Sequence, residues 1–551
     1  MAKKNAKLPV SASDQALVVE PKLTVSVRDK RAFSDALGTF LDITATSTGR
    51  ASFYNTKEEQ EVAEVAAHEK MFLYDRTLYG ALLTLPSVTD RAKQHGMLRL
   101  LSDRTNGGAL SLVGESVDQI ERKILATLAD DVSVPRLMKA FLMLRDAKVN
   151  NGRSRRFVLR TLLRNKGLEI RAVRYRDKFG DILRHVFGKK KASVLRAILE
   201  RPRSTWEKHE VKFVKDQLET VARFSDDNIM QVSIAYALGS DSEFVQQNTA
   251  TSLIKAVFEA RHDLTKGKDL PVEILEGIRS HFHKETKRAD IMEMAAASKT
   301  GMTNTQRMQL QASAQKAGVV TPIEFDPLSQ DSVKLYVYAY ERGMTESISD
   351  ALDKKARDGA ATLPARYGKV GIVMDDSLSM MGNETQKLRP MAIALATRDV
   401  LAQSGDQAVI NYASGRDQGR LPQPSGDTSL AEALVETLIA GVDIVYIISD
   451  GYENAPAGRV SDTIERIRSM GIETPIIQMS PVAAAEAKDD GLRQLSDEVK
   501  TIPVSNPQAM GTNMLRTLVV TDPQLAASVL LKLAFETKSL GNLSEIKKLE
   551  G

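Results

Sequence analysis

The sequence predicts a multidomain protein of two unlike parts, an N-terminal all-α region and a C-terminal α/β region with a doubly wound parallel sheet. Three observations predict this fold class. Apolar residues recur at helical spacing from about residue 29 to residue 361. After residue 366, short apolar runs alternate with helical segments, which is typical of a parallel sheet covered on both faces. The chain has 551 residues, 42% of them apolar, which is enough for about two to four domains.

The N-terminal part is expected to be a stack of helices. Residues 1–28 lack periodicity and are predicted to form a flexible arm. Residues 29–361 contain many helices of about 10 to 15 residues, which favours a HEAT-like α-solenoid. An ordinary bundle stays open as an alternative, because no crisp repeat signature occurs. The helical stripes lie near residues 58–74, 116–128, 134–144, 211–223, 247–260 and 271–282, followed by a connector at 318–331 and one helical segment at 332–356.

The C-terminal part is expected to alternate strands and helices over residues 366–522. Its predicted strands are 369–374, 408–412, 444–449, 474–479 and 499–504, and its predicted helices are 387–403, 430–439 and 460–470. A helical tail, residues 523–551, either belongs to this domain or folds back onto the helical region.

Composition excludes several classes of protein. The chain has no cysteine, which excludes disulfides, thiolate zinc sites and cysteine nucleophiles. We find no apolar run of about 18 residues and no apolar stretch after the basic start at residues 1–7, so we expect a cytoplasmic protein that does not contact a membrane. The net charge of +5 conceals an asymmetry, because residues 151–200 hold 15 Lys and Arg against 4 Asp and Glu, whereas residues 401–500 hold 8 against 16. Such separation favours a polyanion partner for one part only.

Oxygen-bearing side chains follow two predicted strands. Asp375, Ser377 and Ser379 come directly after the first strand, Thr428 lies just before a helical pattern, and Asp450 follows the apolar run 444–449. We expect these side chains to meet, since open α/β sheets bind ligands at the carboxyl ends of their strands. Mg²⁺ prefers oxygen ligands and keeps waters where carboxylates are few. The set therefore predicts a site for Mg²⁺ or another divalent cation, with a position left for a carboxylate or phosphate of a partner.

These five residues resemble the metal-ion-dependent adhesion site (MIDAS) of von Willebrand factor A domains, and stand at that family's ligand positions in the same chain order. The resemblance implies a von Willebrand A-like domain. An Asp/Ser-rich turn on another doubly wound sheet is the alternative interpretation. Asp376 and Glu453 lie nearby in the sequence as acids that could support the ligands, but we expect both to be solvated.

Arginines in the basic segment are spaced for one helix face. Arg153, Arg156, Arg160 and Arg164 are separated by 3, 4 and 4 residues, and Arg171, Arg174 and Lys178 repeat the arrangement on the next segment. Like charges four residues apart cost a helix about 0.2 to 0.5 kcal/mol per pair, a penalty that an anionic partner would offset. We expect the two rows to face solvent together as one positive track. A solvated basic face without a ligand is the alternative.

A second resemblance covers most of the chain, roughly residues 30–520. In order, residues 49–60 (GRASFYNTKEEQ), Gly152-Arg153, residues 174–178 (RYRDK) and residues 338–343 (YAYERG) resemble landmarks of the TROVE domain of Ro RNA-binding proteins, a family that also carries a C-terminal von Willebrand A domain. The resemblance implies a ring or horseshoe of HEAT-like helices that binds small structured or misfolded noncoding RNA. It also implies RNA contacts by Arg174, Arg176 and Lys178. His185 is out of step with the family's histidine.

Three functions compete at this point. The first is a noncatalytic RNA-binding protein of the Ro type with a cation site in its C-terminal part. The second is a scaffold that binds an acidic protein through the metal, without RNA. The third is a metal-assisted hydrolase of nucleic acid, which is disfavoured because two-metal chemistry needs clustered carboxylates and the predicted set supplies only Asp375 and Asp450.

Overall fold

The computed structural model describes residues 30–46, 56–102, 117–164, 167–218, 228–363, 366–382, 384, 387–416, 419–426, 429–453, 456–481, 493–515, 519 and 522–538. The predicted arm, residues 1–28, lies outside the described residues. The first part of the chain is helical. Its α-helices are α1 (Lys30–Thr46), α2 (Lys57–Tyr74), α3 (Arg76–Leu82), α4 (Asp90–Ser102), α5 (Val117–Asp131), α6 (Val134–Asp146), α7 (Gly152–Leu162), α8 (Leu168–Arg174), α9 (Arg176–Phe187), α10 (Lys189–Leu199), α11 (Lys208–Leu218), α12 (Asn228–Ala237), α13 (Glu243–Gln246), α14 (Ser252–Glu259), α15 (Val272–Phe282), α16 (Arg288–Ala297), α17 (Asn304–Ala317), α18 (Ser332–Arg342) and α19 (Glu346–Ala360).

The second part alternates strands and helices, as the sequence predicts. Its elements are β1 (Tyr367–Met374), α20 (Arg389–Ala402), β2 (Gly405–Tyr412), α21 (Leu430–Ile439), β3 (Ile444–Ile448), α22 (Arg459–Ser469), β4 (Ile476–Pro481), β5 (Lys500–Val504), α23 (Met510–Met514) and α25 (Pro523–Lys538). The five strands form one parallel sheet in the order β2-β1-β3-β4-β5. The predicted combination of a helical region with a parallel α/β region is confirmed.

Helices cover both faces of the sheet. Alternate residues of β1 point to opposite sides, because strand side chains alternate. Ile372 and Met374 lie in a core with α18, α19 and α20, whereas Val373 lies in a second core with α21 and α22. Gly371 is required where α21 crosses β1, since a Cβ there would lie 2.4 Å from the Thr437 Cγ2 atom. The chain order reverses between β1 and β3, so the carboxyl ends of these two strands lie at the switch point of the sheet.

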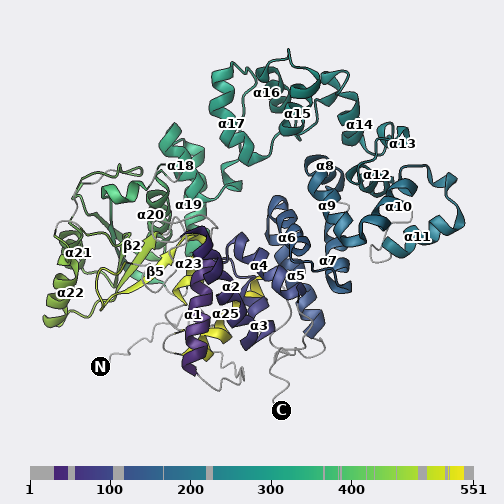
Figure 1. Cartoon of the computed structure of the whole chain (residues 1–551). Helices are drawn as coiled ribbons and strands as arrows, with labels where there is room; N and C mark the ends of the chain where they lie inside the picture. The colour runs from purple at the N-terminus through teal and green to yellow at the C-terminus, as the bar shows by residue number, and fades with distance from the viewer. Residues whose placement is uncertain are drawn as a thin grey trace, which may run out of the picture.

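The helices follow an arc that begins and ends at the sheet (Figure 1). Contacts run from α1 through α2, α4, α6, α9 and α12 to α8, which contacts both α14 and α15, and from α15 through α16 to α17. The Tyr338 hydroxyl on α18 donates to Gln311 on α17, and α18 packs on α20. At the other end, the Ser505 hydroxyl after β5 donates to the Ala45 carbonyl of α1 over 2.5 Å. The described elements therefore form a closed circuit of contacts.

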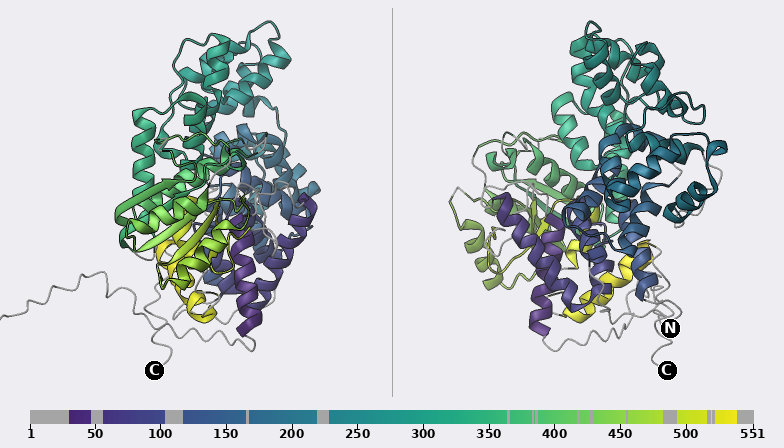
Figure 2. Two further views of the ribbon diagram at one scale, coloured as in Figure 1. Left: turned by 90° about the vertical axis from the view of Figure 1, so that its left-hand side faces the viewer. Right: turned by 45° about the vertical axis from the view of Figure 1, so that its right-hand side comes forward.

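The C-terminal helix folds back onto the N-terminal helices. Figure 2 shows α25, in yellow, beside α1, in purple. Ala527, Leu530 and Leu531 of α25 are fully buried and share the core of the helical region. This settles the position of the described part of the tail, 523–538, which the sequence left open.

Two predicted helical segments are interrupted. Residues 332–356 were expected as one segment, but the chain breaks between α18 and α19 at Gly343, which has a φ of +92° that favours glycine. The basic segment breaks at Tyr175, between α8 and α9. In a further finding, no helix of the described part of the chain combines the length and apolarity needed to cross a membrane.

Candidate cation site and basic groove

Strand β1 delivers Asp375 to a buried turn at the switch point. The Asp375 amide donates to the Ile448 carbonyl of β3 over 2.9 Å, and the side chain has no exposed surface. Its Oδ1 atom accepts a hydrogen bond from the Ser377 amide at 2.9 Å, an Asx-type turn that reverses the chain. The Ser377 and Ser379 hydroxyl oxygens then lie 2.9 Å apart. The Asp-x-Ser-x-Ser segment therefore gathers its three oxygen-bearing side chains in one place.

Asp450 follows β3 and completes a pair of carboxylates. Its Oδ1 atom accepts a hydrogen bond from the Tyr452 amide at 3.1 Å, and it also accepts one from the Ser379 side chain. Burial, and after it the charge of Asp450, raise the pKa of Asp375 to about 6. Burial raises the pKa of Asp450 as well. A buried carboxylate and a half-buried one that repel each other are electrostatically costly without a cation.

The donor set fits a hard divalent cation. Two carboxylates and two hydroxyls are the oxygen ligands that Mg²⁺ accepts, with water in the remaining positions. The structure brings together Asp375, Ser377, Ser379 and Asp450 of the five predicted ligands. Thr428 lies outside the described residues; its neighbour Ser429 is tied to the loop after β2 by a 3.0 Å hydrogen bond from its amide to the Ala413 carbonyl.

One supporting residue, Ser449, escaped the sequence analysis, and the expectation that Asp376 is solvated was wrong. The buried Ser449 hydroxyl donates to the Asp375 Oδ2 atom over 2.6 Å. Asp376 is buried rather than solvated, because its carboxylate accepts from both the amide and the hydroxyl of Ser414. Glu453 is half-buried and accepts a hydrogen bond from the Val460 amide at the start of α22, at 2.9 Å. The signal for Ser449 in the sequence was its position at the end of the apolar run 444–449, directly before Asp450.

Gly451 fixes the chain beyond Asp450. It has a φ of +83°, and a Cβ there would lie 2.4 Å from the Arg493 carbonyl oxygen. That carbonyl is held in place by Gln478 on β4, whose side-chain amide donates to it over 2.9 Å. The turn after β3 is therefore packed against the segment before β5, so that residue 451 has no room for a side chain.

Four of the predicted arginines line one groove. The groove has a volume of about 850 Å³ and lies between α5 and α7. Its wall contains Arg153, Arg156 and Arg160 of α7, Arg164 just after α7, and Arg122 of α5. The half-buried Phe157 adds apolar surface. The spacing of 3, 4 and 4 residues thus produces the shared face that the sequence predicts for this row.

Acidic residues of α5 neutralise part of this groove. Arg164 pairs with Asp130, and Arg122 pairs with Asp118 one turn before it on α5. Arg153 pairs with the buried Glu121, which also holds the buried Arg76. Arg156 and Arg160 are exposed. Several guanidinium groups of the groove therefore already have carboxylate partners within the protein, which reduces the net positive charge of the groove.

The second predicted row does not continue this groove toward solvent. Arg171 donates to the Leu162 carbonyl, and burial followed by the charge of Arg164 lowers its pKa to about 10. Arg174 pairs with Glu273 at 3.0 Å, and Arg176 donates to the Tyr236 carbonyl and stacks on the Tyr236 ring. All three are half-buried.

Lys178 is exposed but lies on α9, beyond the break at Tyr175. The expectation of one positive track over both rows is therefore wrong, because the second row is split between two helices and mostly turned to protein partners. His185 contacts the Val149 carbonyl through its Nε2 atom at 2.9 Å.

The sequence matches no protein-family model, and the search of curated proteins also returned no match.

Proposed function

We propose that the protein is a noncatalytic RNA-binding protein whose RNA site is the arginine-lined groove between α5 and α7. The observation that carries this proposal is the convergence of Arg122, Arg153, Arg156, Arg160 and Arg164 on one groove. Guanidinium groups bind phosphate with paired hydrogen bonds, and the half-buried Phe157 ring offers contact to bases or sugars. The resemblance to TROVE domains supports RNA as the polyanion.

We further propose that the end of the sheet between β1 and β3 holds Mg²⁺ in a von Willebrand A-like adhesion site. Asp375, Ser377, Ser379 and Asp450 would hold the ion, and Thr428 is the fifth proposed ligand. When bound, the cation would supply a positive centre that attracts a carboxylate of a partner protein. Asp376, Ser449 and Gly451 keep the ligands in position. The closed circuit of helices is the arrangement that a HEAT-like ring closed by an A domain would require.

The groove gives a direct test of RNA binding. If all five arginines contact phosphates, the affinity for RNA should fall by roughly 500-fold between about 50 and 200 mM salt. Changing Arg156 and Arg160 together to Gln should weaken binding to a structured noncoding RNA and lower the salt slope by about two. Changing Lys284, which is exposed in the turn after α15, and Lys316, which is exposed on α17, to Gln removes the same charge and is the matched control. Equal losses in both double variants would contradict the groove as the RNA site.

A scaffold without RNA is the second candidate function. It is favoured by the ion pairs that Arg122, Arg153 and Arg164 make with α5, because paired guanidinium groups have less to gain from phosphate. The absorbance ratio at 260 and 280 nm of purified protein, before and after ribonuclease, separates the two functions. A ratio that falls after treatment supports bound RNA. A clean protein spectrum with undetectable binding to structured RNA at low salt supports the scaffold.

A further inference from the structure

The loop between β2 and α21 touches both the cation site and the helical region. We call its described residues, 413–416 and 419–426, the strap. On the site side, the Ser414 amide and hydroxyl donate to the Asp376 carboxylate at 2.9 and 2.5 Å. The Ser425 amide donates to the Asp376 carbonyl at 2.9 Å. Both ends of the strap are thus fixed to the residue that follows Asp375.

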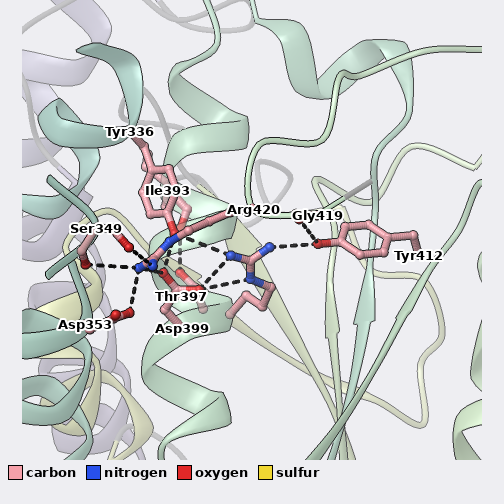
Figure 3. Close-up of polar contacts among 10 residues, drawn as sticks. Tyr336, Ser349, Asp353, Ile393, Thr397, Asp399, Tyr412, Gly419 and Arg420 are labelled. Carbon is pink, nitrogen blue, oxygen red and sulfur yellow. Dashed lines mark hydrogen bonds and ion pairs between the residues drawn. The ribbon is translucent and has the colours of Figure 1, made fainter. Parts of the chain in front are cut away.

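On its other side, the strap is fixed to α18 and α19. The Tyr340 hydroxyl of α18 donates to the Pro422 carbonyl over 2.5 Å. The Arg420 guanidinium donates to the Ser349 hydroxyl at 2.6 Å and to Asp353 at 2.7 Å, both on α19 (Figure 3). The strap therefore joins the last two helices of the helical region to the cation site.

A buried polar network continues this connection beneath Arg420. The Tyr336 hydroxyl of α18 donates to Asp399 of α20, and Arg420 lies 3.9 Å from the same carboxylate. Asp399 also pairs with Arg398, whose Nη1 atom donates to the Tyr412 hydroxyl at 2.7 Å. Tyr412 in turn donates to the Gly419 carbonyl of the strap at 3.3 Å (Figure 3). Helix α18, helix α20 and the strap therefore share one set of hydrogen bonds.

The seam between α19 and the sheet region is polar and incompletely filled. A cavity of about 400 Å³ lies along it, lined by Asp353, Arg398, Asp399 and Arg420 among others. The donors of Arg398 are engaged by Asp399, Tyr336 and Tyr412, so this wall already has its partners within the protein. Polar interfaces between domains permit relative displacement, whereas close-packed apolar ones resist it. The polar edge of the seam can therefore adjust, while Ile348, Ala351 and Leu352 of α19 share an apolar core with α20 and limit the shift of α19.

We propose that the strap couples the cation site to the helices α18 and α19, so that occupancy of the site changes the position and stability of these helices. The proposal rests on the proposed cation site. A displacement of α19 pulls on Arg420, and one of α18 pulls on Pro422. The strap transmits either displacement through Ser414 and Ser425 to Asp376 and hence to Asp375. Because coupling is reciprocal, the state of the helices also changes the affinity for the cation.

The test combines cation binding with hydrogen exchange in the full-length protein. Tyr340→Phe and Arg420→Met together remove the ties to α18 and α19 but leave every proposed metal ligand in place. The matched control is Tyr338→Phe with Arg366→Met. Tyr338 lies on the same helix but donates to α17, and Arg366 forms an exposed pair with Asp406 at the other end of β1. Mn²⁺ is the probe, measured by titration calorimetry, and exchange is followed in the strap and in α19.

In the wild type and the control, Mn²⁺ should slow exchange in both the strap and α19. In the Tyr340→Phe and Arg420→Met variant, the metal-free strap should exchange about tenfold faster. Mn²⁺ should bind that variant about five- to tenfold more weakly, the lower range of measured couplings, and α19 should no longer respond.

Two results would overturn the proposal in distinguishable ways. If Mn²⁺ protects the strap of the wild type while exchange in α19 stays the same, the cation site stands and the coupling is wrong. If the wild type does not bind Mn²⁺, the cation site itself is wrong, and the coupling that depends on it is wrong too.

Discussion

Asp375 and Asp450 follow neighbouring parallel strands, and the charge of Asp450 adds to burial in raising the pKa of Asp375 to about 6. The order of the strands brings the two carboxylates together, since β1 and β3 are adjacent in the sheet although the paired residues Met374 and Ile448 lie 74 positions apart in the sequence. The hydroxyl groups of Ser377, Ser379 and Ser449 lie beside them, and the charge of Arg493 offsets only part of the rise in the pKa of Asp450. The pair is therefore arranged to gain stability from a cation.

Replacing Asp375 with Asn should separate cation binding from stability. Without divalent ions, the neutral amide removes the buried charge and its repulsion from Asp450, so the variant should be at least as stable as the wild type at pH 8. With Mg²⁺, the wild type should gain stability through ligand binding to the folded state, and the variant should not. Urea unfolding in EDTA and in Mg²⁺ measures both effects.

The exposed Asp406 supplies the control, because Asp406→Asn removes an acid from β2 without touching the site. That variant should retain the full response to Mg²⁺. A marked loss of stability of Asp375→Asn in EDTA would contradict the electrostatic account, since it would mean that the hydrogen bonds of Asp375 outweigh its buried charge.

The order of the elements could be predicted from the sequence because periodicity is local. Each strand of the sheet is a short apolar run, and Asp375, Ser377 and Ser379 are contiguous with β1, so their gathering required no knowledge of distant contacts. The break between α18 and α19 was missed, although Gly343 followed by Thr345, whose hydroxyl accepts from the Ile348 amide, is a sequence signal for a helix end and a new start.

The directions of the basic side chains could not be predicted in the same way. Arg174 is turned to Glu273, and Arg164 to Asp130, residues that lie 99 and 34 positions away in the sequence. Helical spacing determines which residues share a face, but the partners across that face come from tertiary packing. Asp376 was misjudged for the same reason, because its partner Ser414 belongs to the next strand's loop.

Removing an acid from the groove should strengthen RNA binding. Asp130→Asn frees Arg164 for phosphate, and both side chains of this pair are largely exposed, so the pair itself contributes little to stability. We expect the affinity for a structured RNA to rise about two- to fivefold at low salt. Filter binding or fluorescence anisotropy measures the change.

The control for this variant is Asp216→Asn, on the exposed side of α11, which changes the net charge equally. It should have a smaller effect. Equal gains in the two variants would mean that net charge, and not the freed arginine, controls the affinity.

The buried His68 should make the helical region sensitive to acid. Burial, and after it the charge of His95, lower the pKa of His68 to about 3, whereas the unfolded chain has an ordinary histidine pKa of about 6.5. The unfolded state therefore binds more protons between these values, so the stability from neutral His68 is present above about pH 6.5 and is lost as the pH falls toward 3. The contribution to the loss between pH 7 and pH 5 is about 2 kcal/mol.

Changing His68 to Gln, which retains a polar partner for the Tyr79 hydroxyl 2.7 Å away, should reduce this loss. Urea unfolding at pH 7 and pH 5 measures it. His209→Gln, at an exposed position, should leave the pH dependence as it is in the wild type. An unchanged slope in His68→Gln would show that other groups dominate acid unfolding.

A methyl group at residue 451 should damage the cation site, whereas the same change at residue 458 should not. Gly451 and Gly458 have nearly the same φ, +83° and +84°, but differ in the space around them. At Gly458 an added Cβ meets nothing within 4 Å, while at Gly451 it would lie 2.4 Å from the Arg493 carbonyl oxygen. Both substitutions carry the strain of a left-handed residue, about 1 to 2 kcal/mol, so the difference between them isolates the steric contact.

Gly451→Ala should therefore be less stable than Gly458→Ala in urea and should bind Mn²⁺ more weakly, because the turn that presents Asp450 has to move. Equal affinities for Mn²⁺ in the two variants would mean that this turn does not position a ligand.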